Sequence, residues 1–142
     1  MPDIVISPTT DVATCRRLRR VVFIHEQGVS EAEELDDLDD QAIHLLATLD
    51  GVAVGSARLL PMGKVGKVGR VCVLAQARGT GLGAALMRAA VAHFRTLPGI
   101  ETVKLGAQTH ALGFYERLGF VAVGPEYMDA GIPHRDMVLA LQ

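Results

Sequence analysis

The chain has 142 residues, a length typical of one domain, and we expect residues 1–142 to fold as a single domain. Hydrophobic residues make up 49% of the chain and aromatic residues only 4%, so the predicted core is mainly aliphatic. The formal net charge of −2 lacks the basic excess of proteins that coat nucleic acids, and we expect no nucleic-acid partner.

Cysteine use and hydropathy bear on the cellular compartment. Cys15 and Cys72 lie far apart, without the spacing of a metal site or a disulfide framework, which predicts two buried free thiols. The N-terminus shows no signal-peptide pattern, and no apolar run approaches the ~20 residues of a membrane span. We therefore expect a cytoplasmic protein that binds neither a membrane nor a metal ion.

A strand and a long helix open the chain. Ile4–Ile6 alternates with polar neighbours and predicts a short strand. Residues 9–11 offer helix N-cap side chains, and a helical pattern then runs to about His25, where Gln27-Gly28 ends it. The arginines of this helix fall mostly outside its apolar stripe, which comprises Val12, Cys15, Leu18 and Val22.

The middle of the chain predicts a surface segment followed by strands. Residues 30–41 are acidic and poor in apolar side chains, which indicates a surface helix or loop. His44–Leu49 and Val52–Leu60 are extended runs joined by an Asp-Gly pair, which is typical of a two-residue hairpin turn. Pro61–Gly69, with its three glycines, predicts a flexible turn, and Arg70–Leu74 predicts a central strand.

A helix, a strand, a short helix and two more strands are predicted in the second half. Gln76–Gly83 is Gly-rich and is followed by a helix to about Arg95, whose predicted buried stripe is Leu82, Ala85, Leu86, Ala89 and His93. The remaining elements are a strand at Thr102–Ala107, a helix at Thr109–Leu118, and strands at Phe120–Val123 and Arg135–Leu141 joined by a loop. This order predicts an α/β (α+β) fold whose mixed sheet carries helices on its faces.

The Gly-rich segment predicts a phosphate-binding loop. A helix N-terminus presents unpaired N–H groups and a partial positive charge, and glycines let the main chain approach an anion closely. Arg78 can add a charge-assisted contact. The segment lacks the βαβ setting and acidic residue of a dinucleotide-binding motif, and it lacks the Gly-Lys-Ser/Thr of a nucleoside-triphosphate loop.

Two motifs carry a resemblance to a known family. Gln76-x-x-Gly79-x-Gly81, between an apolar strand and a helix, resembles the Q/R-x-x-G-x-G/A signature of the GNAT N-acetyltransferase superfamily. The block at residues 108–120 resembles its N-x-x-A-x-x-x-Y-x-x-x-G-F segment, with Gln108 in place of the usual Asn. The resemblance covers nearly all of the chain. It implies a mixed, mostly antiparallel sheet of six to seven strands flanked by about four helices.

Three further segments, at residues 22–29, 39–44 and 131–134, resemble the ElaA-like branch of this superfamily. The resemblance implies that acetyl-CoA is the co-substrate, with its diphosphate on the Gly-rich loop and its pantetheine arm along the preceding strand. The implied cofactor-binding residues are Val71, Cys72, Val73, Gln76, Arg78, Gly79, Thr80, Gly81, Gly83, Gln108, Phe114 and Tyr115.

The resemblance also implies catalytic roles. Tyr115 occupies the position of the general acid that protonates the departing thiolate, although it could instead be a packing aromatic beside Phe114 and Phe120. The general base is open among Glu26, His44 and His134, and an ordered water chain could replace all three. We expect Tyr115, Glu26 and His134 to be catalytic, and Glu26, His44 and His134 to contact the substrate.

The resemblance thus implies an acetyl-CoA-dependent N-acetyltransferase acting on the primary amine of a small molecule or a peptide. The acidic residues 31–40 are then either a solvated face or a rim that attracts a cationic amine. The alternative is a module that binds acyl-CoA without catalysis. Relatives of this kind are often homodimers, so a homodimer is also an expectation.

Overall fold

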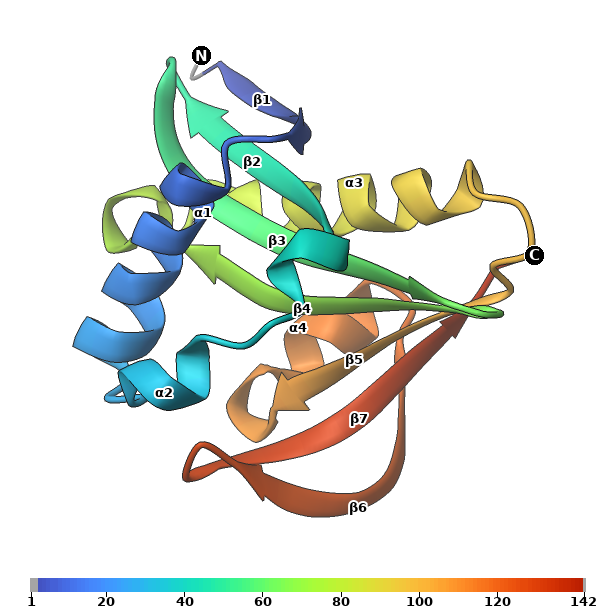
Figure 1. Cartoon of the computed structure of the whole chain (residues 1–142). Helices are drawn as coiled ribbons and strands as arrows, with labels where there is room; N and C mark the ends of the chain where they lie inside the picture. The colour runs from blue at the N-terminus through green and yellow to red at the C-terminus, as the bar shows by residue number, and fades with distance from the viewer. Residues whose placement is uncertain (1–2, 142) are drawn as a thin grey trace.

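The computed structural model describes residues 3–141 and shows a seven-stranded sheet in this part of the chain (Figure 1). The strand order is β1-β2-β3-β4-β5-β7-β6, in which β4 and β5 are parallel and the other neighbours are antiparallel. The predicted mixed, mostly antiparallel sheet is confirmed. The strands are β1 (Ile4–Thr9), β2 (Ile43–Leu49), β3 (Val52–Met62), β4 (Val65–Val73), β5 (Thr102–Gln108), β6 (Val121–Asp129) and β7 (Ile132–Ala140).

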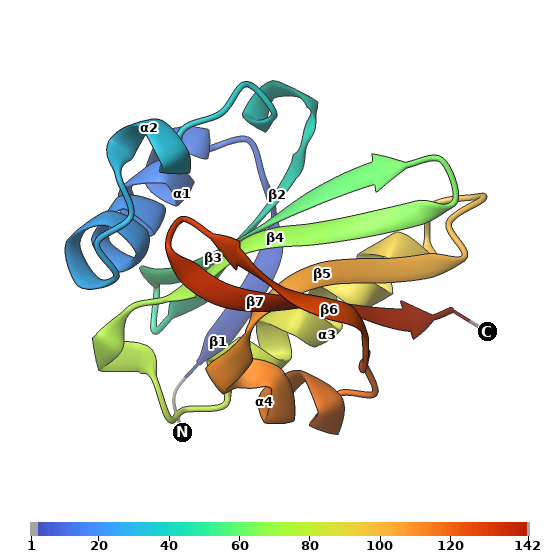
Figure 2. The ribbon, with the colours of Figure 1, turned by 90° about the horizontal axis from the view of Figure 1, so that it is seen from below.

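Helices cover both faces of the sheet. α1 and α2 lie on one face, and α3 and α4 lie on the other (Figures 1 and 2). The predicted first helix is confirmed, but its second half, Arg20–Glu26, is a π-helix. The α-helices are α1 (Val12–Arg19), α2 (Glu31–Glu34), α3 (Leu82–Arg95) and α4 (Leu112–Arg117).

Asp11 caps the start of α1. Its carboxylate accepts hydrogen bonds from the Thr14 N–H at 3.2 Å and from the Thr14 hydroxyl at 2.6 Å. Further along the helix, Leu18 and Val22 pack against Cys72 of β4 in a small core cluster. The cap and this apolar stripe place α1 across the centre of the sheet.

The main core lies between α3 and the sheet. The buried side chains of α3 are Leu82, Leu86, Met87, Ala90 and Phe94. The predicted stripe was right at Leu82 and Leu86, whereas Ala85, Ala89 and His93 are only half-buried. The buried face of α3 therefore differs from the predicted one. It includes Phe94, whose ring lies over Gly66 of β4, where an added Cβ would lie 2.5 Å from the ring.

Two segments that were predicted to be loops are strands. Most of residues 61–69 belongs to β3 and β4, because Gly66 makes room for a neighbouring ring instead of supplying flexibility. Residues 124–134 form most of the β6–β7 hairpin, which turns at Ala130-Gly131 with φ values of 52° and 75°. Gly124 and the following proline lie where the register of this hairpin shifts, so they mark a bulge.

The acidic segment is attached to the protein by arginines, which neither interpretation of its charge anticipated. Glu34 is 4% exposed and Asp39 is 3% exposed. Arg19, which the helical pattern placed off the apolar stripe, is only 1% exposed. We call the group the buried ion cluster; it comprises Arg16, Arg19, Arg58, Arg70, Glu34, Asp36 and Asp39.

Asp39 is the centre of this cluster. Arg19 donates to its two carboxylate oxygens at 2.9 and 3.0 Å and to Glu34 at 2.6 Å. Arg16 donates to Asp39 at 2.9 Å. Because a buried carboxylate is costly unless it is paired, these contacts fix the segment after α2 against α1 and the sheet.

We expect Asp39→Asn to lower the free energy of unfolding by about 3 kcal/mol, because it leaves buried guanidinium groups without their counter-charge. The matched control is Asp40→Asn, since Asp40 is exposed and no described residue pairs with it; its effect should stay within about 0.5 kcal/mol. Urea unfolding measures both values. Equal stabilities for the two variants would contradict the structure.

The same proteins test whether the effect is electrostatic. Burial alone raises the pKa of Asp39, but hydrogen bonds from Arg19 and Arg16 outweigh it and hold the pKa well below its usual range. A pKa lowered in the folded state contributes stability above the unfolded-state value of about 4, and this stability is lost at lower pH. The difference between wild type and Asp39→Asn should therefore shrink between about pH 6 and about pH 2.5.

Candidate functional site

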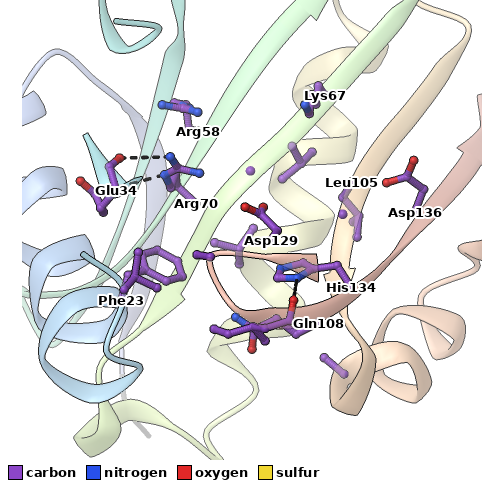
Figure 3. A pocket seen from close by; sticks show the side chains of 18 of the residues that line it. Phe23, Glu34, Arg58, Lys67, Arg70, Leu105, Gln108, Asp129, His134 and Asp136 are labelled. Atoms are coloured by element: carbon purple, nitrogen blue, oxygen red, sulfur yellow. Dashed lines mark hydrogen bonds and ion pairs between the residues drawn. The ribbon is translucent and has the colours of Figure 1, made fainter. Parts of the chain in front are cut away.

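A cleft opens where β4 and β5 part. Their pairing ends at Val68 and Leu105, although β4 continues to Val73 and β5 to Gln108. The cleft has a volume of about 550 Å³ and lies among these strands, the segment around α2 and the β6–β7 hairpin (Figure 3). Main-chain groups on the facing sides of the parted strands lack a strand partner, so they can pair with an extended ligand.

β4 bulges at the wall of this cleft. It carries one residue more than β3 between Gly69 and Cys72, and Arg70 in this stretch has a φ of 51°, which is costly for a residue with a Cβ. The Arg70 guanidinium donates to the carbonyl oxygens of Glu33 and Glu34 at 3.3 and 3.1 Å. The bulge thus holds α2 at the edge of the cleft.

The Gly-rich loop after β4 has an open surface above it. Gly79 and Gly81 have φ values of 79° and 83°, and an added Cβ at either would meet no atom within 4 Å. Gly81 starts α3 without a side-chain cap, and its carbonyl accepts the N–H of Ala85. The N–H groups of residues 82–84 therefore have no acceptor within the helix and form a site for an anion.

Arg78 connects this loop to the end of the first helix. Its Nε donates to the Val73 carbonyl at 3.1 Å, and its Nη2 donates to the two carboxylate oxygens of Glu26 at 2.5 and 2.9 Å. Glu26 is thus engaged on both oxygens, which weighs against it as the general base. The Val73 carbonyl, expected to be a cofactor contact, is engaged as well.

Both tyrosines of the chain line the cleft, but their hydroxyl groups differ. Burial raises the pKa of Tyr115 to about 12, so this residue keeps its proton at neutral pH. No described residue accepts a hydrogen bond from Tyr115, whereas Tyr127 donates to Asp136 at 2.6 Å. Tyr115 therefore has the hydroxyl that is free to donate to a ligand.

His134 lines the cleft with its imidazole in a defined tautomer. Its Nδ1 lies 2.7 Å from the Ile132 carbonyl, which can only accept, so Nδ1 carries the hydrogen. The neutral ring then has its lone pair on Nε2. Tyr127 stacks on the imidazole, with ring centroids 5.9 Å apart, and fixes its plane. His134 is thus prepared to accept a proton in the cleft.

His44 does not reach the cleft, contrary to expectation. It is 4% exposed, and its Nε2 lies 2.9 Å from the carbonyl oxygen of Asp39. Because that carbonyl can only accept, Nε2 is the donor, and His44 braces the segment that carries the buried ion cluster. It lies behind the wall of the cleft and not on its surface.

The other predicted cofactor residues border the end of β4. Val71 lines the cleft, but the side chain of Cys72 is buried 3.5 Å from the Ser56 hydroxyl. Burial raises the pKa of the Cys72 thiol to about 11, so only its main chain is suited to contact a ligand. Gly83 faces Phe114, whose ring would lie 3.6 Å from an added Cβ. The remaining predicted loop residues are Gln76, which is exposed, and Thr80, whose hydroxyl donates to the Ala77 carbonyl at 2.6 Å.

Gln108, at the unpaired end of β5, joins two segments. Its Nε2 donates to the side-chain oxygen of Gln27 at 2.9 Å, and its own amide oxygen accepts from His110 at 2.7 Å. Gln108 also lies opposite His134 in the β5–β7 pairing. The side chain that replaces the usual Asn therefore bridges the first helix and the turn before α4.

The comparisons with known proteins agree with this geometry. A family model described as an acetyltransferase (GNAT) domain matches residues 13–141. The chain belongs to the GNAT acetyltransferase family. A Bacillus subtilis protein named as an acetyltransferase is 38% identical over 132 residues, which cover 91% of this chain and 89% of that protein.

Solved GNAT structures superpose over almost the whole chain. An acyl-CoA N-acyltransferase from Pseudomonas aeruginosa is 34% identical, with a TM-score of 0.83 and coverage of 97% of this chain and 99% of that one. Escherichia coli ElaA is 28% identical, with a TM-score of 0.82 and the same coverage. The protein is thus a GNAT acyltransferase, and its predicted resemblance to this family and to ElaA is confirmed.

The described part of this GNAT acyltransferase fits the acyl-CoA that its family uses. The uncapped start of α3 and the open surface over Gly79 and Gly81 suit a diphosphate. The parted strand β4 suits an extended arm with amide groups. Within residues 3–141, no helix is both long and apolar enough to cross a membrane.

Sequence reasoning missed many of the residues that line the cleft in this GNAT protein. The missed lining residues include Gln27, Arg58, Lys67, Arg70, Lys104, Tyr127, Asp129 and Asp136. The alternation of Lys67 with Gly69, and of Lys104 with Gly106, was the available signal, because alternate residues share one face of a strand. For Lys67 it was not used because residues 61–69 were interpreted as a turn, and for Lys104 the strand was predicted without assigning its faces.

We expect the two buried histidines of this GNAT protein to have opposite tautomers. At a pH where both rings are neutral, nitrogen NMR shifts should show the hydrogen on Nδ1 of His134 and on Nε2 of His44. Each ring serves as the control for the other. The same tautomer in both rings would contradict the hydrogen bonds on which the choice of base depends.

Proposed function

We propose that this acyltransferase moves the acetyl group of acetyl-CoA directly to a primary amine. The observation that carries the proposal is that Tyr115, with a free hydroxyl, and His134, with a free Nε2, line the same cleft at the parting of β4 and β5. One group is suited to donate a proton and the other to accept one. The family membership supplies acyl-CoA chemistry and an amine acceptor in general terms.

The Gly-rich loop and the end of β4 would hold the co-substrate. The N–H groups of residues 79–84 would bind the diphosphate, and the main chain of Val71 would pair with the pantetheine arm. Phe114, which packs against Gly83, would border the same groove. These contacts would bring the thioester near the mouth of the cleft, beside Tyr115.

His134 would act as the general base. An alkylamine must lose a proton before or as it attacks the thioester carbonyl, and the lone pair on Nε2 of His134 can accept that proton. The new bond joins the amine nitrogen to the acetyl carbon, and the carbon–sulfur bond breaks. Glu26 is not assigned this role because both of its carboxylate oxygens accept hydrogen bonds from Arg78. His44 is not assigned it because its ring is hydrogen-bonded to the Asp39 carbonyl inside the protein.

Tyr115 would act as the general acid. Its hydroxyl donates the proton that the departing sulfur needs, and solvent returns the proton from His134 to the tyrosinate. A pKa of about 12 keeps the hydroxyl protonated before each turnover. The hydroxyl of Tyr127 is unsuited to this role because it already donates its hydrogen bond to Asp136.

Thermal unfolding and thiol release test the function together. Acetyl-CoA should raise the unfolding temperature, whereas ATP and NAD should not, because a ligand that binds only the native state stabilises it. A panel of primary amines with acetyl-CoA should then release free coenzyme A thiol. A shift with acetyl-CoA without turnover of any amine would favour a module that only binds acyl-CoA.

We expect Tyr115→Phe to lower kcat by about a hundredfold or more, because it removes the general acid. Acetyl-CoA should still raise the unfolding temperature of this variant, which shows that binding is intact. Tyr127→Phe is the matched comparison, and its fall in kcat should be much smaller because its hydroxyl is bonded to Asp136. Steady-state kinetics with thiol detection measure both. An unchanged kcat in Tyr115→Phe would refute the assignment.

A further inference from the structure

The floor of the cleft carries a free positive charge away from the reacting groups. Lys67 and Lys104 occupy opposed positions in the β4–β5 pairing, and both line the cleft (Figure 3). The Lys104 ammonium lies 3.5 Å from Asp136, which also accepts the Tyr127 hydroxyl. Lys67 has no acidic partner within residues 3–141. An anion on the ligand is the group that this lysine lacks.

The buried ion cluster, which forms the adjacent wall, has arginine N–H groups without an acceptor. Its members away from solvent are three arginines and three carboxylates, and its fourth arginine, Arg16, is 47% exposed. Arg58 is 5% exposed and lines the cleft, yet its Nε has no hydrogen-bond partner, and the same holds for Nε of Arg70. These are the buried side-chain polar atoms without a partner in the described chain, and such atoms call for an explanation.

The arginine–carboxylate distances in this wall also indicate that Arg70 is incompletely paired. Arg58 forms a bidentate pair with Asp36 at 2.7 and 3.0 Å, whereas Arg70 reaches Asp36 at 3.3 Å and Glu34 only at 3.9 Å. Burial lowers the pKa of Arg70, and so does the neighbouring charge of Arg58. Arg70 is therefore the arginine of this cluster with the longest carboxylate contacts, and it lines the cleft.

A free negative charge lies nearer to the reacting end. Asp129, at the tip of the β6–β7 hairpin, is exposed and has no cationic partner in the described chain. Figure 3 places its carboxylate between Arg70 and His134. An ammonium group that approaches His134 passes this carboxylate. The cleft thus has a negative charge near the proposed base and a positive charge at its far end.

We propose that the acceptor is a zwitterion: a primary amine that carries a carboxylate or a phosphate, with the anion bound by Lys67 beside Arg58 and Arg70 and the amine presented to His134. This inference rests on the proposed acetyl transfer and narrows its acceptor. Lys67 lies opposite Lys104, and His134 lies opposite Gln108, which is four residues or roughly 13 Å further along β5; the extended lysine and histidine side chains span much of this separation. The amine and the anion are therefore separated by a chain of a few carbon atoms.

Amines of matched length test this class. With acetyl-CoA and the full chain, kcat/KM for 4-aminobutyrate or O-phosphoethanolamine should exceed that for butylamine and 1,4-diaminobutane by about tenfold or more. A higher value for 4-aminobutyrate indicates a carboxylate, and a higher value for O-phosphoethanolamine indicates a phosphate. An equal or higher kcat/KM for butylamine or 1,4-diaminobutane overturns the proposed zwitterionic acceptor but leaves the proposed acetyl transfer intact.

Charge variants locate the recognition at Lys67. Lys67→Gln should raise KM for the preferred anionic amine by about tenfold, with kcat and the butylamine kinetics little changed. Lys67→Glu should reverse the preference in favour of 1,4-diaminobutane. Lys64→Gln is the control, because it removes the same charge at a side chain that is 79% exposed in the β3–β4 turn. An equal effect of Lys67→Gln on all amines overturns the proposal.

An equilibrium measurement separates this inference from the proposed function. Calorimetric titration of N-acetyl-4-aminobutyrate and N-acetyl-O-phosphoethanolamine into the chain with coenzyme A needs no turnover. Binding of either that weakens in Lys67→Gln and not in Lys64→Gln supports the anion site even if catalysis fails. No binding of either compound, or equal binding in both variants, overturns the anion site even if butylamine is acetylated.

Discussion

Parallel pairing between β4 and β5 lasts for only four residue pairs, and the functional cleft exists because the strands do not rejoin. A continuous sheet would satisfy the main chain of both strands and leave no groove. Two packing features accompany the divergence: the bulge at Arg70 in β4, and the Phe114 ring that packs on Gly83 at the start of α3. The parting places the phosphate-binding loop beside β4 and the proposed base, His134, across the gap on β7.

The buried ion cluster builds the other wall of the same cleft. A short segment with one turn of helix has too little apolar surface to dock by itself. Arginines from α1, β3 and β4 hold it through Glu34, Asp36 and Asp39, and His44 adds a hydrogen bond to its main chain. Three of the side chains that fix this wall, Glu34, Arg58 and Arg70, also line the cleft, so the same groups contribute to stability and to the surface that a ligand would meet.

Hydrogen-bond occupancy, rather than residue type, separates the candidate catalytic groups. Glu26, His44 and His134 all have suitable chemistry, but only His134 lines the cleft with an unoccupied nitrogen. The same reasoning divides the two tyrosines, because the hydroxyl of Tyr127 is bonded to a carboxylate and that of Tyr115 is free to donate. A group that is already hydrogen-bonded within the protein is not available to the substrate. This criterion selects both members of the proposed acid–base pair.

The local patterns in the sequence determined the fold class, the first and third helices, most strand positions, and the phosphate-binding loop. Each of these depends on neighbouring residues: the alternation in strands, the cap at Asp11, and the glycines between β4 and α3. The acetyltransferase family followed from the same short motifs, and the family comparison bears it out.

Only the tertiary structure decided which side chains line most of the cleft. Residues 61–69 were interpreted as a flexible turn and residues 124–134 as a loop, whereas Gly66 makes room for Phe94 and Gly124 lies at a bulge in a long hairpin. The acidic segment was interpreted as a solvated face or a rim because its arginine partners are between 11 and 37 residues away. Contacts between residues so far apart leave no periodic signal in the chain, since they depend on which strand and helix faces meet after folding.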